Sequence, residues 1–207
     1  MSSFQRLPTW WFRQERLKNF NGGKQIGESI ASLKVLACIA LHIDYKSLSA
    51  KISISDIEVI TGLSRPMVMK GIYKLEKEEM VVVDREWNTN LYTLTELHED
   101  SNWAKMPSTT IKTNLKNIPN RGIAAFGALK IYLSLLALRD NSSQNVKISY
   151  EKIREWTGLQ SCHIRSSLDV LYNHSFIHIY KSEELDFTKE DKHAHNVYKI
   201  VGNLLIR

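Results

Sequence analysis

The chain carries the same pattern twice, and this internal repeat limits its possible folds more than any other feature. Residues 51–83 align with residues 147–179 without a gap, at a constant offset of 96 residues. Within them, Thr61-Gly62-Leu63 matches Thr157-Gly158-Leu159. Solenoid repeats are shorter, about 20 to 45 residues, so a repeat of this length predicts two similar domains.

Length and lead-in motifs suggest where the two domains divide. A chain of 207 residues accommodates two domains of ordinary size. Leu7-Pro8-Thr9 and Met106-Pro107-Ser108 have the same pattern of an apolar residue, proline and a hydroxyl residue. We therefore predict a first domain over residues 1–103 and a second over residues 104–207.

Each repeat predicts a helix-turn-helix. An apolar helix is expected near 30–43 and near 125–138, followed by short strands at 52–54 and 148–150. Ser55, with Glu58 three residues later, predicts a capping box at the start of a short helix. That helix should end at the glycine of each Thr-Gly pair. A second amphipathic helix, which we call the reading helix, then begins after Ser64 in the first repeat. Its counterpart in the second repeat carries Ile164, Leu168 and Leu171 on one apolar face.

A β-hairpin is expected to close each unit. Residues 80–83 and 90–94 read as two strands, as do residues 176–180 and 196–200. Helix, strand, helix, helix and hairpin is the order of a winged helix. The predicted fold class is therefore mostly α with small β wings (α+β), in two tandem winged helix-turn-helix domains related by internal duplication.

Positive charge is unevenly placed along the chain. Residues 1–103 are electrically balanced, so the formal net charge of +6 belongs to residues 104–207. Both repeats open with a basic strip, residues 1–34 and 104–139, and the second strip has no acidic residue. A basic strip at the same place in both repeats favours a polyanion as the partner.

The outward face of each reading helix carries side chains that can contact DNA. An α-helix fits the major groove, where Arg or Lys donates to guanine and neighbouring lysines reach phosphates. The first helix supplies Ser64, Arg65, Met67, Lys70 and Lys74; the second supplies Gln160, Ser161, His163, Arg165 and Ser166. Asp169 would repel phosphate, so the second helix has a protein surface as its alternative role.

Other candidates lie outside the reading helices. The first wing offers Arg85 and Asn88, and Trp87 either lies on the sugar–phosphate backbone or covers the first domain. Lys112, Lys116 and Lys192 complete the set of predicted DNA contacts. The Trp10-Trp11-Phe12 cluster either packs on the protein or mediates self-association or base stacking.

Several functional classes lack support in the sequence. There is no phosphate-binding loop, GxSxG, HExxH, CxxC or paired-carboxylate motif, so neither an enzyme nor a cofactor is expected. His193 and His195 have no third metal ligand at a useful spacing. No apolar run reaches the roughly 18 residues of a membrane span, and the first 13 residues lack the apolar centre of a secretion signal. Two cysteines, with Cys38 expected in the core, suggest a reducing cytoplasm.

Ile52–Leu94 and Ile148–Ile200, each with its own reading helix and wing, resemble the tandem winged helices of plasmid replication initiators. The opening Leu7-Pro8-Thr9-Trp10-Trp11-Phe12 is also similar to the lead-in of phage and plasmid replication proteins. The resemblance implies binding of double-stranded origin repeats, recruitment of host replication proteins, and repression of the protein's own promoter as a homodimer. It places the protein in the cytoplasm, on the nucleoid or a plasmid. Two alternatives remain open: a transcriptional or partition regulator of a mobile element, and a winged-helix scaffold that binds proteins.

Overall fold

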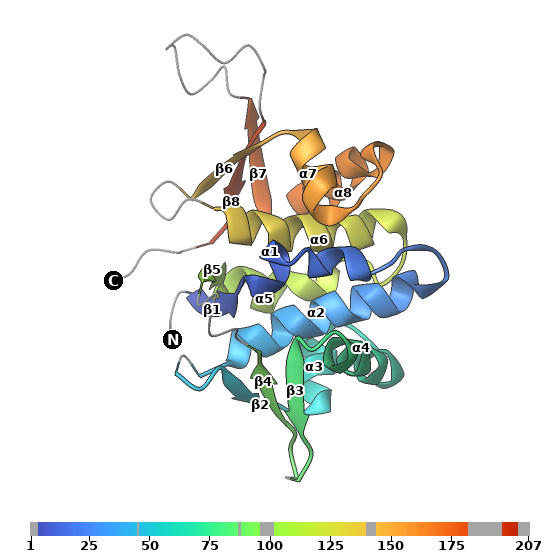
Figure 1. Ribbon diagram of the computed structural model, residues 1–207, viewed down its shortest axis with the longest axis vertical. Coiled ribbons are helices and arrows are strands. Elements are labelled where there is room, and N and C mark those ends of the chain that lie inside the picture. Colours follow the sequence, from blue (N-terminus) through green and yellow to red (C-terminus); the bar gives the residue numbers. More distant parts are fainter. Residues whose placement is uncertain are drawn as a thin grey trace.

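Two long apolar helices run through the centre of the molecule (Figure 1). The computed structural model describes residues 4–44, 46–86, 88–95, 102–139, 144–181 and 196–202. Helices α2 (Ile26–His42) and α6 (Ile123–Leu138) are buried along most of their length. Both are apolar on every side, so burial on every side is the favourable arrangement. The chain enters both helices at the same end of the molecule (Figure 1).

The same order of elements follows each central helix. The first unit contains β2 (Ser49–Lys51), α3 (Ile54–Thr61), α4 (Arg65–Lys77), β3 (Val81–Asp84) and β4 (Leu91–Leu94). The second unit contains β6 (Asn145–Ile148), α7 (Tyr150–Thr157), α8 (Ser161–Asn173), β7 (Ile177–Lys181) and β8 (Asn196–Ile200). Each unit forms an antiparallel three-stranded sheet, in the orders β2-β4-β3 and β6-β8-β7. An α+β fold with small sheets is thus confirmed.

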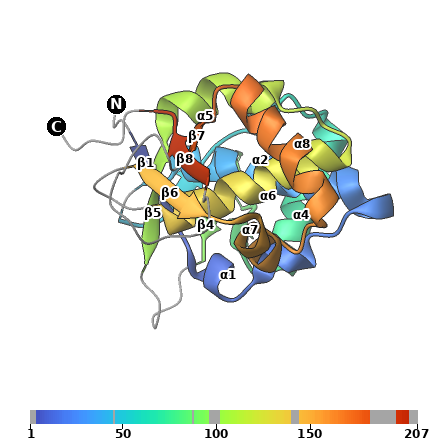
Figure 2. The same ribbon diagram turned by 90° about the horizontal axis from the view of Figure 1, so that it is seen from above.

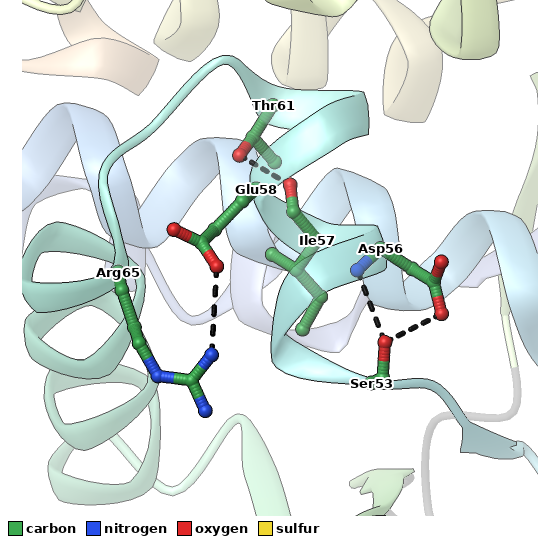
Figure 3. Close-up of polar contacts among 6 residues, drawn as sticks. All are labelled: Ser53, Asp56, Ile57, Glu58, Thr61 and Arg65. Atoms are coloured by element: carbon green, nitrogen blue, oxygen red, sulfur yellow. Dashed lines mark hydrogen bonds and ion pairs between the residues drawn. The ribbon is translucent and has the colours of Figure 1, made fainter.

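The start of each short helix differs from the sequence prediction. The predicted strands at 52–54 and 148–150 are wrong, because β2 ends at Lys51 and β6 at Ile148. Ser53, not Ser55, caps α3: its Oγ accepts from Asp56 N at 3.1 Å and donates to Asp56 Oδ2 at 2.6 Å (Figure 3). In the second unit, Ser149 Oγ likewise accepts from the third residue of α7.

A lead-in segment precedes each central helix. The first lead-in, residues 4–25, contains β1 (Phe4–Pro8), α1 (Trp10–Arg13), η1 (Arg16–Asn19) and η2 (Gly23–Gln25). The second lead-in, residues 103–122, contains β5 (Trp103–Pro107), α5 (Ser108–Asn114) and η3 (Leu115–Asn117). Their strands β1 and β5 pair with each other in an antiparallel ladder, so the halves are joined by a sheet as well as by helices.

The first lead-in lies between the two units. Trp10 Nε1 donates to Thr95 O at 2.7 Å, just after β4 of its own unit. Phe12 stacks on Trp156 of the other unit, with ring centroids 4.5 Å apart. Trp10, Trp11 and Phe12 are all buried, which confirms that this aromatic cluster packs on the protein.

The second lead-in likewise contacts both its own unit and the other one. Thr110 Oγ1 donates to Val201 O at 2.8 Å, just after β8 of its own unit. Further along, Lys116 lies against Gly62 of the first unit. The buried apolar side chains of both units, Cys38 included, form one continuous cluster. Each lead-in therefore contacts both units.

The reading helices α4 and α8 occupy equivalent places. Helix α4 packs on the first half of α2, where Gly71 meets Ala31, and α8 packs on the first half of α6, where Gly127 meets Ser167. Figures 1 and 2 show both reading helices toward the end of the molecule at which the chain enters α2 and α6.

Candidate nucleic-acid interface

The turn before each reading helix is built twice from the same contacts. Thr61 Oγ1 donates to Ile57 O at 2.6 Å (Figure 3). The same oxygen accepts from Leu63 N at 3.3 Å. Gly62 has φ 67°, a left-handed conformation that glycine adopts without steric cost. Thr157, at the same place in the second unit, makes the same two hydrogen bonds at the same distances. The repeat therefore specifies a turn of fixed geometry in both units.

Three of the predicted contacts in α4 face solvent. Ser64 is at the N-cap position and exposed, and its hydroxyl makes no capping hydrogen bond. The Arg65 side chain is exposed, with Nη1 3.6 Å from Glu58 Oε2 across the turn (Figure 3). Lys70 is also exposed, whereas Met67 is half-buried and reaches toward Gly27. The cations of this face are therefore available to a partner.

Lys74 does not belong to that face, and its prediction as a solvent-exposed contact is wrong. Its exposed fraction is only 6%. The ammonium group lies 3.4 Å from Ser29 Oγ and 5.5 Å from the centre of the Phe20 ring. Gly71, one turn earlier, brings α4 close to α2, so the side chain of Lys74 is enclosed between the helices.

Two hydrogen bonds join the β3–β4 hairpin to α4. Arg85 donates two hydrogen bonds to Glu76, at 2.8 and 2.6 Å, and this pairing raises the pKa of Arg85. Part of its positive charge is thus balanced within the protein. Asn88 is exposed. Trp87 lies outside the described residues.

The second reading helix has a nearly neutral outward face. Gln160, Ser161 and Arg165 are exposed, while His163 and Ser166 are half-buried. The hydroxyl of Ser166 donates to the carbonyl of His163 at 3.0 Å. Asp169 is exposed and lies one turn after Arg165, so the face carries one charge of each sign.

Only part of each basic strip lies on the surface. Lys112 and Lys116 are exposed, as is Arg121. Lys34, Lys130 and Arg139 are buried, so counting them toward a surface footprint is wrong. Lys34 and Lys130 lie within the buried central helices α2 and α6, and Arg139 directly follows α6. Lys192, with His193 and His195, lies outside the described residues.

The two buried lysines support the turns from inside. Lys34 Nζ donates to Thr61 O at 2.9 Å, and Lys130 Nζ donates to Thr157 O at 2.8 Å. Burial lowers the pKa of Lys34 to about 8, and burial with nearby Lys74 lowers the pKa of Lys130 to about 8. Both amines are therefore mostly charged at neutral pH. A positive charge at a helix C-terminus is favourable, because carbonyl oxygens there lack helical donors.

Sequence reasoning missed two apolar side chains on the outward face of α4. Met69 and Tyr73 are 45% and 67% exposed, one helical turn apart. Their spacing of four residues was a usable signal, since it places them together beside Lys70. Apolar side chains on a reading helix can contact the thymine methyl group. Asn120, which donates to Gly62 O at 2.6 Å, was also missed, and no local pattern marks it.

No group of three His, Cys, Asp or Glu side chains suited to a metal ion occurs within the described ranges. Over the same part of the chain, no helix combines the length and apolar content that crossing a membrane requires. No protein-family model matches the sequence, and no curated protein is significantly similar to it.

Proposed function

We propose that this protein binds specific sequences in double-stranded DNA through two tandem winged helix-turn-helix domains, residues 1–103 and 104–207. We further propose that it initiates replication of a plasmid or other mobile element, by binding rather than by catalysis. The observation that supports this most is the pair of reading helices, each following a rigid Thr-Gly turn. Both lie toward the same end of the molecule, so one duplex could meet both (Figures 1 and 2).

The charge of α4 favours DNA over a protein partner. Arg65, Lys70 and Lys77 are exposed along this helix. Among the described carboxylates, only Glu58 forms an ion pair with any of them, at 3.6 Å. Each lysine or arginine that neutralises a phosphate releases condensed counterions, which favours binding at low salt. Exposed cations, only one of which has a described carboxylate partner, on a helix that can enter the major groove therefore support contact with a polyanion.

Charge reversal on α4 tests the DNA-binding proposal. Arg65→Glu with Lys70→Glu should lower affinity for duplex DNA by more than about 100-fold at physiological salt, because two phosphate contacts become repulsions. The matched control is Lys46→Glu with Lys147→Glu, which changes net charge equally. Both control lysines are exposed and follow the far ends of α2 and α6. Fluorescence anisotropy with a labelled duplex measures both variants.

The control decides what a loss of affinity means. Binding that falls equally in both double variants would indicate a general effect of net charge and would refute α4 as the contact. If the native protein fails to bind any duplex at low salt, DNA binding itself is refuted. A scaffold that binds proteins through its exposed Tyr73 and Met69 would then be the better interpretation.

A footprint on DNA cloned from around the gene separates an initiator from a regulator. Several regularly spaced repeats, each about two helical turns long, are expected if both reading helices enter successive major grooves at an origin. One short palindrome over a promoter would instead indicate a dimeric repressor. The initiator proposal also requires that the gene and the protected DNA together sustain a plasmid that lacks its own origin. It further implies a homodimer at the promoter and host replication proteins as partners at a cytoplasmic origin.

A further inference from the structure

The second lead-in lies directly against the turn of the first unit. Asn120 Nδ2 donates to Gly62 O at 2.6 Å. A Cβ atom added to Gly62 would lie 3.2 Å from Lys116 O and 3.3 Å from Lys116 Cβ. Glycine is thus needed at this position both for its left-handed φ and for the closeness of residues 116–120.

Lys34 fixes this arrangement from the interior. Its ammonium donates to Thr61 O at 2.9 Å, to Ile118 O at 2.6 Å and to Asn120 Oδ1 at 2.6 Å. An ammonium has three N–H groups, so all of them are used. Since Thr61 ends α3 and Ile118 belongs to the second lead-in, one buried side chain holds the two segments together. The exposed side chains on either side of this contact therefore have a defined position relative to α4.

Two of those exposed side chains are cations without a partner among the described carboxylates. Lys116 and Arg121 flank the Asn120–Gly62 hydrogen bond, and both are exposed. Neither forms an ion pair with any carboxylate in the part of the chain that the structure describes. The equivalent position in the first lead-in differs. Lys18 lies against Gly158, but its ammonium is 2.6 Å from Glu15 Oε2, so its charge is balanced.

We propose that Lys116 and Arg121 contact the phosphate backbone of the duplex that α4 binds. The second half of the chain then completes the DNA interface of the first unit. Contacts at the turn before a reading helix suit the phosphate backbone, which sets the register of the helix without reading sequence. This inference rests on the DNA binding proposed above. It adds Arg121 to the interface and assigns Lys116 to the first unit.

The salt dependence of binding by the full chain tests the proposal. Lys116→Gln with Arg121→Gln should weaken binding of specific and unrelated duplexes by a similar factor, roughly 10-fold or more near 150 mM salt. The slope of log affinity against log salt should become shallower by about 2, because each phosphate that a cation neutralises contributes about 0.9 to it. Both side chains are exposed, so the midpoint of denaturant unfolding should stay unchanged and serves as the folding control.

The repeat offers a matched single control. Lys18→Gln removes a cation from the equivalent place, where Glu15 already balances it, and should change affinity by less than about twofold. Equal effects of Lys116→Gln and Lys18→Gln would overturn the proposal. An unchanged salt slope in the Lys116→Gln, Arg121→Gln variant would also overturn it. If Arg65→Glu with Lys70→Glu still lowers DNA affinity in that case, the proposed DNA binding through α4 stands without this further inference. A native protein that binds no duplex would overturn both.

Discussion

The two units place the glycine of the same helix contact on opposite helices. In the first unit, Gly71 of α4 faces Ala31 of α2, and a Cβ on the glycine would lie 2.9 Å from the carbonyl carbon of Ala31. In the second unit, Gly127 of α6 faces Ser167 of α8, and the added Cβ would lie 2.1 Å from Ser167 Oγ. Both contacts occupy the same place in the repeat. The close approach of the helices therefore needs one glycine, and either helix can supply it.

The buried lysines show a second difference between the units. Lys34 and Lys130 each donate to the last residue of the short helix, Thr61 or Thr157. Lys34 adds two acceptors from the second lead-in, whereas Lys130 lies over the Phe126 ring, 4.8 Å from its centre. The first turn is thus bound to the other half by hydrogen bonds, and the corresponding lysine of the second unit is stabilised by an aromatic ring.

The largest loss of stability is expected when Gly71 is replaced by serine, the residue of the second unit at this position, while Ala31 is kept on the facing helix. Gly71→Ser should lower the free energy of unfolding by about 2–3 kcal/mol, because the new side chain meets backbone atoms of Ala31 that cannot rotate away. Adding Ala31→Gly leaves these backbone atoms in place but removes the Ala31 side chain, so the two helices can shift to the packing of the second unit. This shift should recover about 1 kcal/mol or more, although glycine alone costs about 1 kcal/mol in a helix. Guanidinium unfolding of the three variants measures the coupling. Strictly additive effects would contradict the exchange of glycine between helices.

A smaller difference is expected between the buried lysines. Lys34→Met leaves three acceptors without their donor. Each unpaired buried group costs roughly 1–3 kcal/mol, but the substitution also removes a buried charge, which offsets part of this cost. The free energy of unfolding should therefore fall by about 2 kcal/mol at pH 7. Lys130→Met leaves one such acceptor and should cost about 1 kcal/mol. Equal costs would show that the contacts with Ile118 and Asn120 add nothing.

The pH dependence of unfolding provides a second measurement on these variants. Burial lowers the pKa of Lys34 from its ordinary value of 10.5 to about 8. Between these values the unfolded chain holds a proton that the native chain has released, so the contribution of Lys34 to stability rises with pH. Below pH 8 both states hold the proton, so the contribution stays at its lowest value. The difference in unfolding free energy between the native protein and Lys34→Met should therefore be greater at pH 10 than at pH 7.

The order of elements could be predicted from the sequence, because it depends on local patterns that occur twice. The Thr-Gly turns, the apolar central helices and the hairpin strands all follow from spacing and propensity. The boundary before α3 was wrong because Ile52-Ser53-Ile54 alternates like a strand, whereas Ser53 uses its hydroxyl as a cap. Glu58, three residues after Ser55, favoured that serine as the cap, whereas the structure pairs Ser53 with Asp56.

The contact of each lead-in with the other unit could not be predicted, because it depends on residues far apart in the chain. Lys34 and Asn120 are 86 residues apart, and nothing in their neighbourhoods marks them as partners. The burial of Lys74 was missed for a related reason. Spacing places it on the same side of α4 as Lys70, but the closeness of α2 at Gly71 turns that edge of the helix into an interior position. Periodicity predicts which residues share a face, but not how far a neighbouring helix extends over it.

The smallest expected effect addresses whether both reading helices contact DNA. Lys70 of α4 is exposed, and Ser166 occupies the equivalent position in α8. Lys70→Ser copies the second unit, and should weaken DNA binding by about 1 kcal/mol and flatten the salt slope by about 0.9, the value of one phosphate contact. Ser166→Lys copies the first unit, and its long side chain can extend from a half-buried position to solvent. If α8 lies against the duplex, this substitution should strengthen binding and steepen the slope by a similar amount. Anisotropy titrations at several salt concentrations measure both.

The opposite result is an unchanged salt slope in Ser166→Lys together with weaker binding by Lys70→Ser. It would show that only the first reading helix contacts DNA. The nearly neutral face of α8, with Asp169, would then be free for a protein partner.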